Sequence, residues 1–133
     1  MAGVGDGVYR ITLDGRQILT AFGGGDAVLL PERTDRQAWH VQKTEKETWV
    51  IRPADSSHFL GFDGEPETFE RVRVSGQPSE WRIIDGPQSG TFTIGAPDSG
   101  LTLGLHPALV FPPLIALSPS FGEDKGWSFE KID

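Results

Sequence analysis

The sequence of 133 residues contains no cysteine, and it is short of cations and of long apolar runs. Without cysteine, neither disulfides nor thiolate-bound metal ions hold the fold together, which suits a reducing compartment. The start of the chain has neither a basic segment nor an apolar segment of the kind that directs secretion. We therefore expect a cytoplasmic protein that does not associate with membranes.

The shortage of cations bears on possible partners. Lysine and arginine total 12 against 19 acidic residues, which gives a formal net charge of −7. Nucleic-acid binding depends on clustered lysine and arginine side chains that neutralise phosphates. The composition therefore argues against a nucleic-acid partner.

Signatures of catalysis and of metal binding are also missing. The histidines share no metal-ligand spacing, and there is no cysteine nucleophile. The acidic loop with Glu65, Glu67 and Glu70 lacks the ordered oxygen ligands of a calcium loop, and Gly23-Gly24-Gly25 lacks the following Lys-Ser/Thr of a phosphate-binding loop. We expect a non-enzymatic protein without a metal or another cofactor.

What the chain does contain is many turn residues between short apolar runs. There are 17 glycines and 10 prolines, while 37% of the residues are hydrophobic and four are tryptophan. Enough apolar surface is therefore present for a folded core, and the frequent turn residues favour a β-protein over a helical one.

A repeated pattern organises these runs. Three blocks each begin with aromatic-x-Ile and close with a tryptophan, and they run from Tyr9 to Trp39, from Trp49 to Trp81, and from Phe92 to Trp127. Within the blocks, the opening isoleucines and the leucines of the second strand align as follows: Ile11, Ile51 and Ile94; Leu19, Leu60 and Leu103. The period of about forty residues, with four strands in each block, indicates a repeat architecture.

This repeat predicts an all-β fold, the β-trefoil, with twelve strands in three four-strand units of one domain spanning residues 1–133. The units cover about 7–45, 46–86 and 87–133, and three are too few for a propeller. In a trefoil, six strands close a barrel and six form hairpins that cap one end. The recurring Ile, Leu and Trp side chains are expected in the core, so function is expected on the loops.

The first unit contains three notable segments, Ile11-Thr12-Leu13-Asp14-Gly15, Gly23-Gly24-Gly25-Asp26 and Gln37-Ala38-Trp39. Together they resemble one repeat of a ricin-B-type lectin, whose Q-x-W signature is present in the last of them. The other units depart from this signature, with Ser79-Glu80-Trp81 and Lys125-Gly126-Trp127. The resemblance implies a carbohydrate as the partner.

A second set of segments is spread over nearly the whole chain: Gly7-Val8-Tyr9-Arg10-Ile11, residues 26–32 and 79–83, Gly90-Thr91-Phe92-Thr93-Ile94, and Pro113-Leu114-Ile115-Ala116-Leu117. With these segments the chain resembles the β-trefoil serine-protease inhibitors of mushrooms. This resemblance implies a monomeric protein of fungal defence that presents the rigid loop between its second and third strands to a protease. The residues of that contact loop would be Gly24, Gly25, Asp26, Ala27 and Val28.

This loop contains no arginine or lysine for the acidic specificity pocket of a trypsin-like enzyme. Alternative contacts on neighbouring loops are Arg16, Arg33 and Arg36. On the strength of the second resemblance, the leading hypothesis is a non-enzymatic serine-protease inhibitor. The alternatives are a ricin-B-like lectin and a cysteine-protease inhibitor of the mycocypin type, which shares the trefoil fold.

Overall fold

In the computed structural model the described residues are 4–22, 25–108, 110–119 and 126–132, and they form twelve strands and no helix. The strands are β1 (Gly7–Leu13), β2 (Gln17–Ala21), β3 (Ala27–Leu30), β4 (Trp39–Lys43), β5 (Trp49–Pro53), β6 (Phe59–Gly61), β7 (Arg73–Ser75), β8 (Arg82–Asp85), β9 (Phe92–Gly95), β10 (Thr102–Leu105), β11 (Ile115–Ser118) and β12 (Trp127–Lys131). This part of the chain therefore offers no helix long and apolar enough to cross a membrane.

Six strands form a closed ring. Antiparallel pairing runs from β12 to β1, β4 and β5, and from β8 to β9 and back to β12. The ring closes between β5 and β8 through Trp49 and Trp81, whose backbone amides each donate to the other residue's carbonyl, at 2.7 and 2.8 Å. Closure leaves these strands without an open edge.

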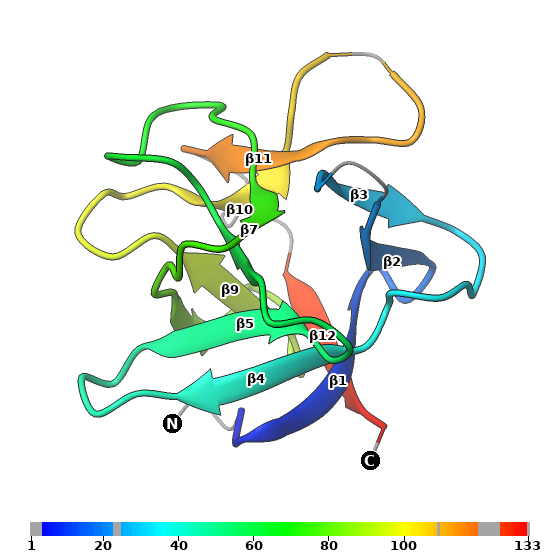
Figure 1. The fold of residues 1–133 in the computed structure, drawn as a ribbon, viewed down its shortest axis with the longest axis horizontal. Helices are drawn as coiled ribbons and strands as arrows, with labels where there is room; N and C mark the ends of the chain where they lie inside the picture. Colours follow the sequence, from blue (N-terminus) through cyan, green and yellow to red (C-terminus); the bar gives the residue numbers. More distant parts are fainter. Residues whose placement is uncertain (1–3, 23–24, 109, 120–125, 133) are drawn as a thin grey trace.

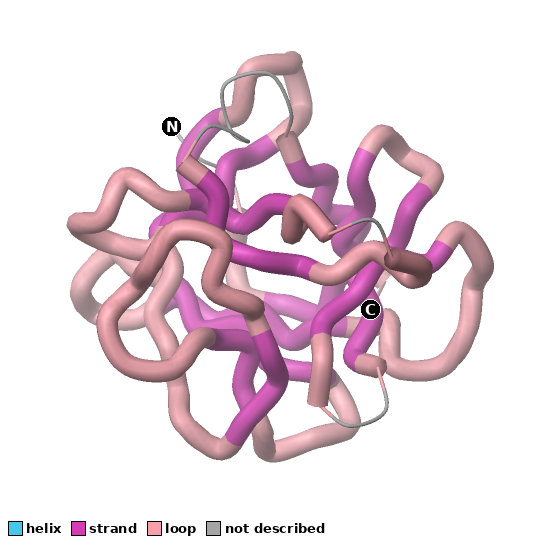
Figure 2. Tube along the Cα trace, turned by 90° about the horizontal axis from the view of Figure 1, so that it is seen from above, coloured by secondary structure: helices cyan, strands magenta, loops and turns pink. Residues whose placement is uncertain are grey.

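The other six strands form three hairpins, β2–β3, β6–β7 and β10–β11. Figure 1 shows the hairpin strands β3, β7 and β11 on one side of the barrel strands β1, β4 and β5, and Figure 2 shows loops arranged around the strands. Single bridges link the hairpins to each other, between Asp26 and Arg73, Val28 and Leu114, and Arg71 and Ala116. This arrangement confirms the predicted β-trefoil.

The third strand of the second unit is short, with three residues. The structure begins β7 at Arg73, because the preceding residues pair with the third unit instead. The amide of Val72 donates to the carbonyl of Ile115 at 2.9 Å, and Arg71 bridges Ala116. The hairpin cap is therefore built partly from contacts between units.

The three repeated tryptophans lie in the core with at most 1% of their surface exposed. Each indole N–H donates to a backbone carbonyl of its own unit: Trp39 to Leu19 at 2.9 Å, Trp81 to Leu60 at 3.0 Å, and Trp127 to Leu103 at 3.0 Å. A buried indole requires such an acceptor. The core role predicted for these residues is confirmed, and the same bond fixes the fourth strand against the second in every unit.

Candidate functional site

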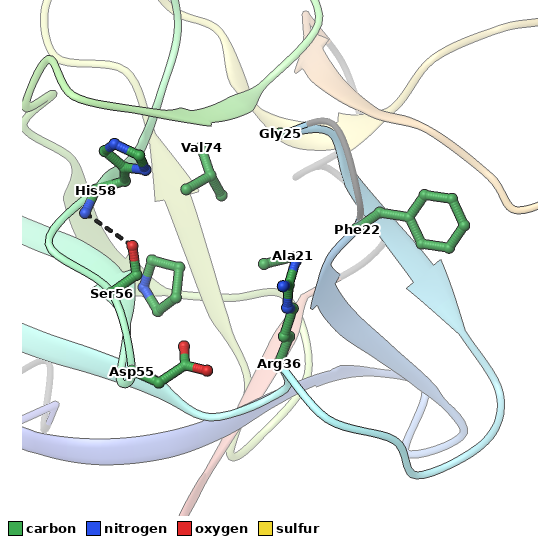
Figure 3. Close-up of a pocket in the computed structure, with 9 residues that line it drawn as sticks. Ala21, Phe22, Gly25, Arg36, Asp55, Ser56, His58 and Val74 are labelled. Carbon is green, nitrogen blue, oxygen red and sulfur yellow. Dashed lines mark hydrogen bonds between the residues drawn. The ribbon is translucent and has the colours of Figure 1, made fainter.

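A cavity of about 500 Å³ lies where the first and second units meet. Its volume falls within the range of about 300–1,000 Å³ that is usual for small-molecule sites. The wall from the first unit is the end of β2 with Phe22, Gly25 and Arg36, and the wall from the second unit is mainly the connection after β5 (Figure 3). The lining residues are Ala21, Phe22, Gly25, Arg36, Pro53, Asp55, Ser56, His58 and Val74.

Hydrogen bonds hold the second-unit wall, residues 54–58, in one conformation. The amide of Ser56 donates to the carbonyl of Pro53 at 3.1 Å, and the guanidinium of Arg52 donates to the carbonyl of Ser56 at 3.0 Å. The hydroxyl oxygen of Ser56 also accepts the amide of His58 at 3.0 Å. Since a hydroxyl group both accepts and donates, Ser56 still has a proton to offer to a ligand.

The first-unit wall is equally constrained. Arg36 has a φ of 67° in the left-handed region, and its carbonyl accepts the amide of Ala21 at 3.0 Å. Gly25 has a φ of 93°, and its carbonyl accepts the amide of Val74 at 2.7 Å. A Cβ added to Gly25 would lie 3.2 Å from the carbonyl oxygen of Val74. Glycine is therefore needed here, both for its backbone angle and for the close approach.

The polar groups of the cavity differ in hydrogen-bonding character across its width. Figure 3 shows Asp55, Ser56 and His58 on one side and Arg36 on the other. A carboxylate accepts, a guanidinium donates, and a hydroxyl group does both. No ion pair or side-chain hydrogen bond within the described ranges engages the Asp55 carboxylate or the Arg36 guanidinium. Both groups are therefore free to bind a ligand that carries donors and acceptors.

The apolar part of the cavity is aliphatic. Ala21, Pro53 and Val74 line it, whereas the ring of Phe22 points away from the cavity in Figure 3 and is 42% exposed. Phe22 thus contributes its backbone to the wall, and its ring is not a stacking surface inside the cavity.

The segment predicted as a protease contact lies beside this cavity, but its side chains point elsewhere. Gly24 lies outside the described residues. Asp26 pairs with Arg71 at 2.6 Å and with Arg73 at 3.6 Å. Ala27 and Val28 are 1% exposed within β3, so neither can enter a protease subsite unless the strand leaves the sheet.

The three arginines predicted as alternative contacts fall into two separate places. Arg36 lines the main cavity. Arg16 and Arg33 lie together at a second recess, of about 390 Å³, which shares no lining residue with the main cavity.

Sequence reasoning missed Asp55, Ser56 and His58 as site residues. The signal that points to them is a difference between units. The first and second strands of the first unit are joined through the tight Asp14-Gly15 turn, whereas the second unit has the longer polar connection 54–58. Loops that diverge on a repeated scaffold are where binding residues are expected.

Comparisons with known structures agree on the fold. The chain is similar to the Macrolepiota procera ricin B-like lectin in complex with lactose, with a TM-score of 0.83 and 21% identity over 99% of this chain and 100% of that one. It is also similar to the Rhizoctonia solani agglutinin, with a TM-score of 0.76 and 18% identity over 99% of both chains.

A designed three-fold symmetric protein, ThreeFoil, matches with a TM-score of 0.80 and 16% identity over 96% of this chain and 100% of that one. No protein-family model matches the sequence, and no curated protein does. At these identities the likeness establishes the fold alone: the chain is a β-trefoil like the ricin B-like lectins of mushrooms.

Proposed function

We propose that this protein is a carbohydrate-binding lectin whose sugar site is the cavity between the first and second units. The observation that carries the proposal is the pair of unengaged groups, the Asp55 carboxylate and the Arg36 guanidinium, on opposite walls of a rigid cavity. The likeness of the whole chain to a lectin in complex with lactose supports it.

The chemistry of the lining suits a neutral saccharide. Neighbouring sugar hydroxyls donate to the two oxygens of a carboxylate, here Asp55, and a hydroxyl or ring oxygen accepts from Arg36. Ser56 and His58 add a donor or an acceptor on the same side as Asp55. Pro53 and Val74 offer aliphatic surface to the C–H groups of the sugar ring.

Calorimetric titration with lactose, preceded by a glycan array to find stronger ligands, tests the proposal. The informative variant is Asp55→Asn, which keeps the shape of the side chain and removes its charge. Because hydrogen bonds to charged groups are worth about 1.5–3 kcal/mol, we expect affinity to fall by about tenfold or more.

Asp98→Asn is the matched control, because Asp98 is an exposed aspartate that precedes a serine in the corresponding connection of the third unit. It should leave sugar affinity unchanged. The proposal is overturned if no glycan binds, or if the Asp55 and Asp98 variants have equal effects.

Protease inhibition stays a prediction from the sequence resemblance, as does a non-catalytic, monomeric role in the cytoplasm. The burial of Ala27 and Val28 counts against the 24–28 segment as the contact. Inhibition assays against trypsin-, chymotrypsin-, elastase- and papain-like enzymes are the direct test. Inhibition that survives Asp55→Asn would separate that activity from the sugar site.

A further inference from the structure

A second recess, of about 390 Å³, lies on the outer face of β1 and β12. Arg10 and Thr12 on β1 are directly opposite Glu130 and Ser128 on β12, and all four line the recess. Gly15 and Arg16 line it from the turn after β1, Ile18 from β2, and Pro31 and Arg33 from the segment after β3. Several distant parts of the chain therefore converge on one place.

The charge of this recess is opposite to that of the protein. The chain carries a formal net charge of −7, yet three arginines line the recess, Arg10, Arg16 and Arg33, against one carboxylate. That carboxylate, Glu130, already pairs with Arg10 at 2.7 Å between Nη1 and Oε1. The recess thus keeps an excess of positive charge that its own residues do not neutralise.

Several donors of these arginines have no partner. Arg16 and Arg33 are exposed, and neither guanidinium is engaged by any residue that the structure describes. The Nε of Arg10 is buried, and it too lacks a hydrogen-bond partner there. Planar guanidinium groups bind carboxylate and sulfate oxygens in a forked geometry, so converging free guanidiniums favour an oxyanion.

We propose that this recess binds an oxyanion, the sulfate ester or carboxylate of an acidic saccharide. Arg16 and Arg33 hold its oxygens from two sides, and the hydroxyls of Thr12 and Ser128 donate from the strands. Arg10 contributes its remaining N–H groups. The anion part of this inference rests on the recess alone, and the saccharide part rests on the proposed lectin function.

The first test is a titration with inorganic sulfate at constant ionic strength, followed by the NMR shifts of backbone amides. Wild type is compared with Arg16→Gln/Arg33→Gln and with the control Arg82→Gln, which removes an exposed arginine outside the recess. We expect the double variant to weaken sulfate binding about tenfold or more and the control to change it less than twofold. Equal effects of the two variants would overturn the site, since the loss would then reflect net charge alone.

A second variant is expected to raise sulfate affinity, and a gain in affinity cannot be explained by unfolding of the variant. Glu130→Gln removes the one carboxylate of the recess and frees Arg10 from its ion pair. Sulfate affinity should rise several-fold, because a repulsive charge is removed and a donor becomes free. An unchanged or lower affinity would contradict the proposed role of Arg10.

The saccharide part is tested with galactose 6-sulfate and glucuronate against galactose, the neutral sugar. Tighter binding of either acidic sugar, abolished in Arg16→Gln/Arg33→Gln, supports the inference, and it also shows whether sulfate or carboxylate is preferred. No preference for acidic sugars overturns it, whatever happens at the other cavity. The lectin proposal fails separately, if lactose binding is absent or insensitive to Asp55→Asn.

Discussion

The connection after β5 in the second unit and the one after β9 in the third unit both contain an Asp-Ser pair, although their backbones differ: Asp98 and Gly100 have positive φ angles and no residue of 54–58 does. In both, the serine hydroxyl accepts the amide two residues on, from His58 at 3.0 Å and from Leu101 at 3.1 Å. The side chains differ in use. Ser99 also donates its hydroxyl proton to the carbonyl of Ala96 at 2.8 Å, and Leu101 is buried, whereas His58 is exposed and lines the cavity.

The repeated scaffold therefore carries the candidate site in one place through differences in side chains between its units. The serine hydroxyl stabilises the connection in both units by accepting the same kind of backbone bond. In the third unit the hydroxyl proton of Ser99 is used within the connection, and Leu101 packs into the core. In the second unit Asp55, Ser56 and His58 line the cavity instead. Arg36 from the first unit lies on the opposite side of that cavity (Figure 3).

The largest expected effect is on stability, through the core of repeated tryptophans that supports both connections. Trp81→Ala should lower the free energy of unfolding by about 3–5 kcal/mol, because it leaves a cavity in the core and removes the donor to Leu60. Denaturant unfolding measures this. Trp81→Phe is the milder companion and should lose less, because most of the ring volume remains. Near-equal losses would show that the hydrogen bond dominates over packing.

The next effect concerns the close approach that shapes the first-unit wall. Gly25→Ala places a methyl group 3.2 Å from the carbonyl oxygen of Val74 at a φ of 93°. We expect a loss of about 1–3 kcal/mol in the free energy of unfolding, together with weaker sugar binding. Gly64→Ala is the control, because its φ of 63° is also positive but its Cβ would meet nothing within 4 Å. Equal losses would mean that the backbone angle alone is responsible.

The strand order and the core were predictable because the same residue types recur in all three units. Leu19, Leu60 and Leu103 occupy one register position, as do the three tryptophans, and each tryptophan makes the same bond to its leucine. A pattern present three times gives the strand order and the core without any long-range information. The trefoil and its core were therefore predicted correctly, with small shifts at strand ends.

The candidate site was not predictable in the same way, because it lies between units. Arg36 and Asp55 lie far apart in the sequence, and nothing in their spacing shows that the two walls of the cavity face each other. The contact segment 24–28 was chosen from a resemblance, although the apolar run from Ala27 to Leu30 itself predicts a strand, and the structure shows Ala27 and Val28 buried within that strand. Likewise, Arg16 and Arg33 were considered separately, and the fold brings them to one recess.

A third variant makes the connection of the second unit more like that of the third. His58→Leu replaces an exposed imidazole in the cavity with the residue type that the third unit has at Leu101. Lactose affinity should fall by about tenfold, the value of one or two hydrogen bonds, while stability changes by less than about 0.5 kcal/mol. Titration calorimetry and thermal unfolding separate the two effects, and unchanged affinity would remove His58 from the site. His58→Gln, which keeps donors and acceptors, should retain more of the affinity than the leucine variant.

The smallest effect is expected at the ion pairs beside the cavity. Asp26 pairs with Arg71 and Arg73 between hairpins of neighbouring units, and all three side chains are partly exposed. Exposed ion pairs contribute about 0–1 kcal/mol, so Asp26→Asn should lower the free energy of unfolding by no more than about 1 kcal/mol, and less at high salt. Unfolding at low and high ionic strength tests this. A loss that does not depend on salt would mean that Asp26 acts through hydrogen bonds across the unit boundary. The boundary between the first two units would then be held by directional contacts, as the core of each unit is.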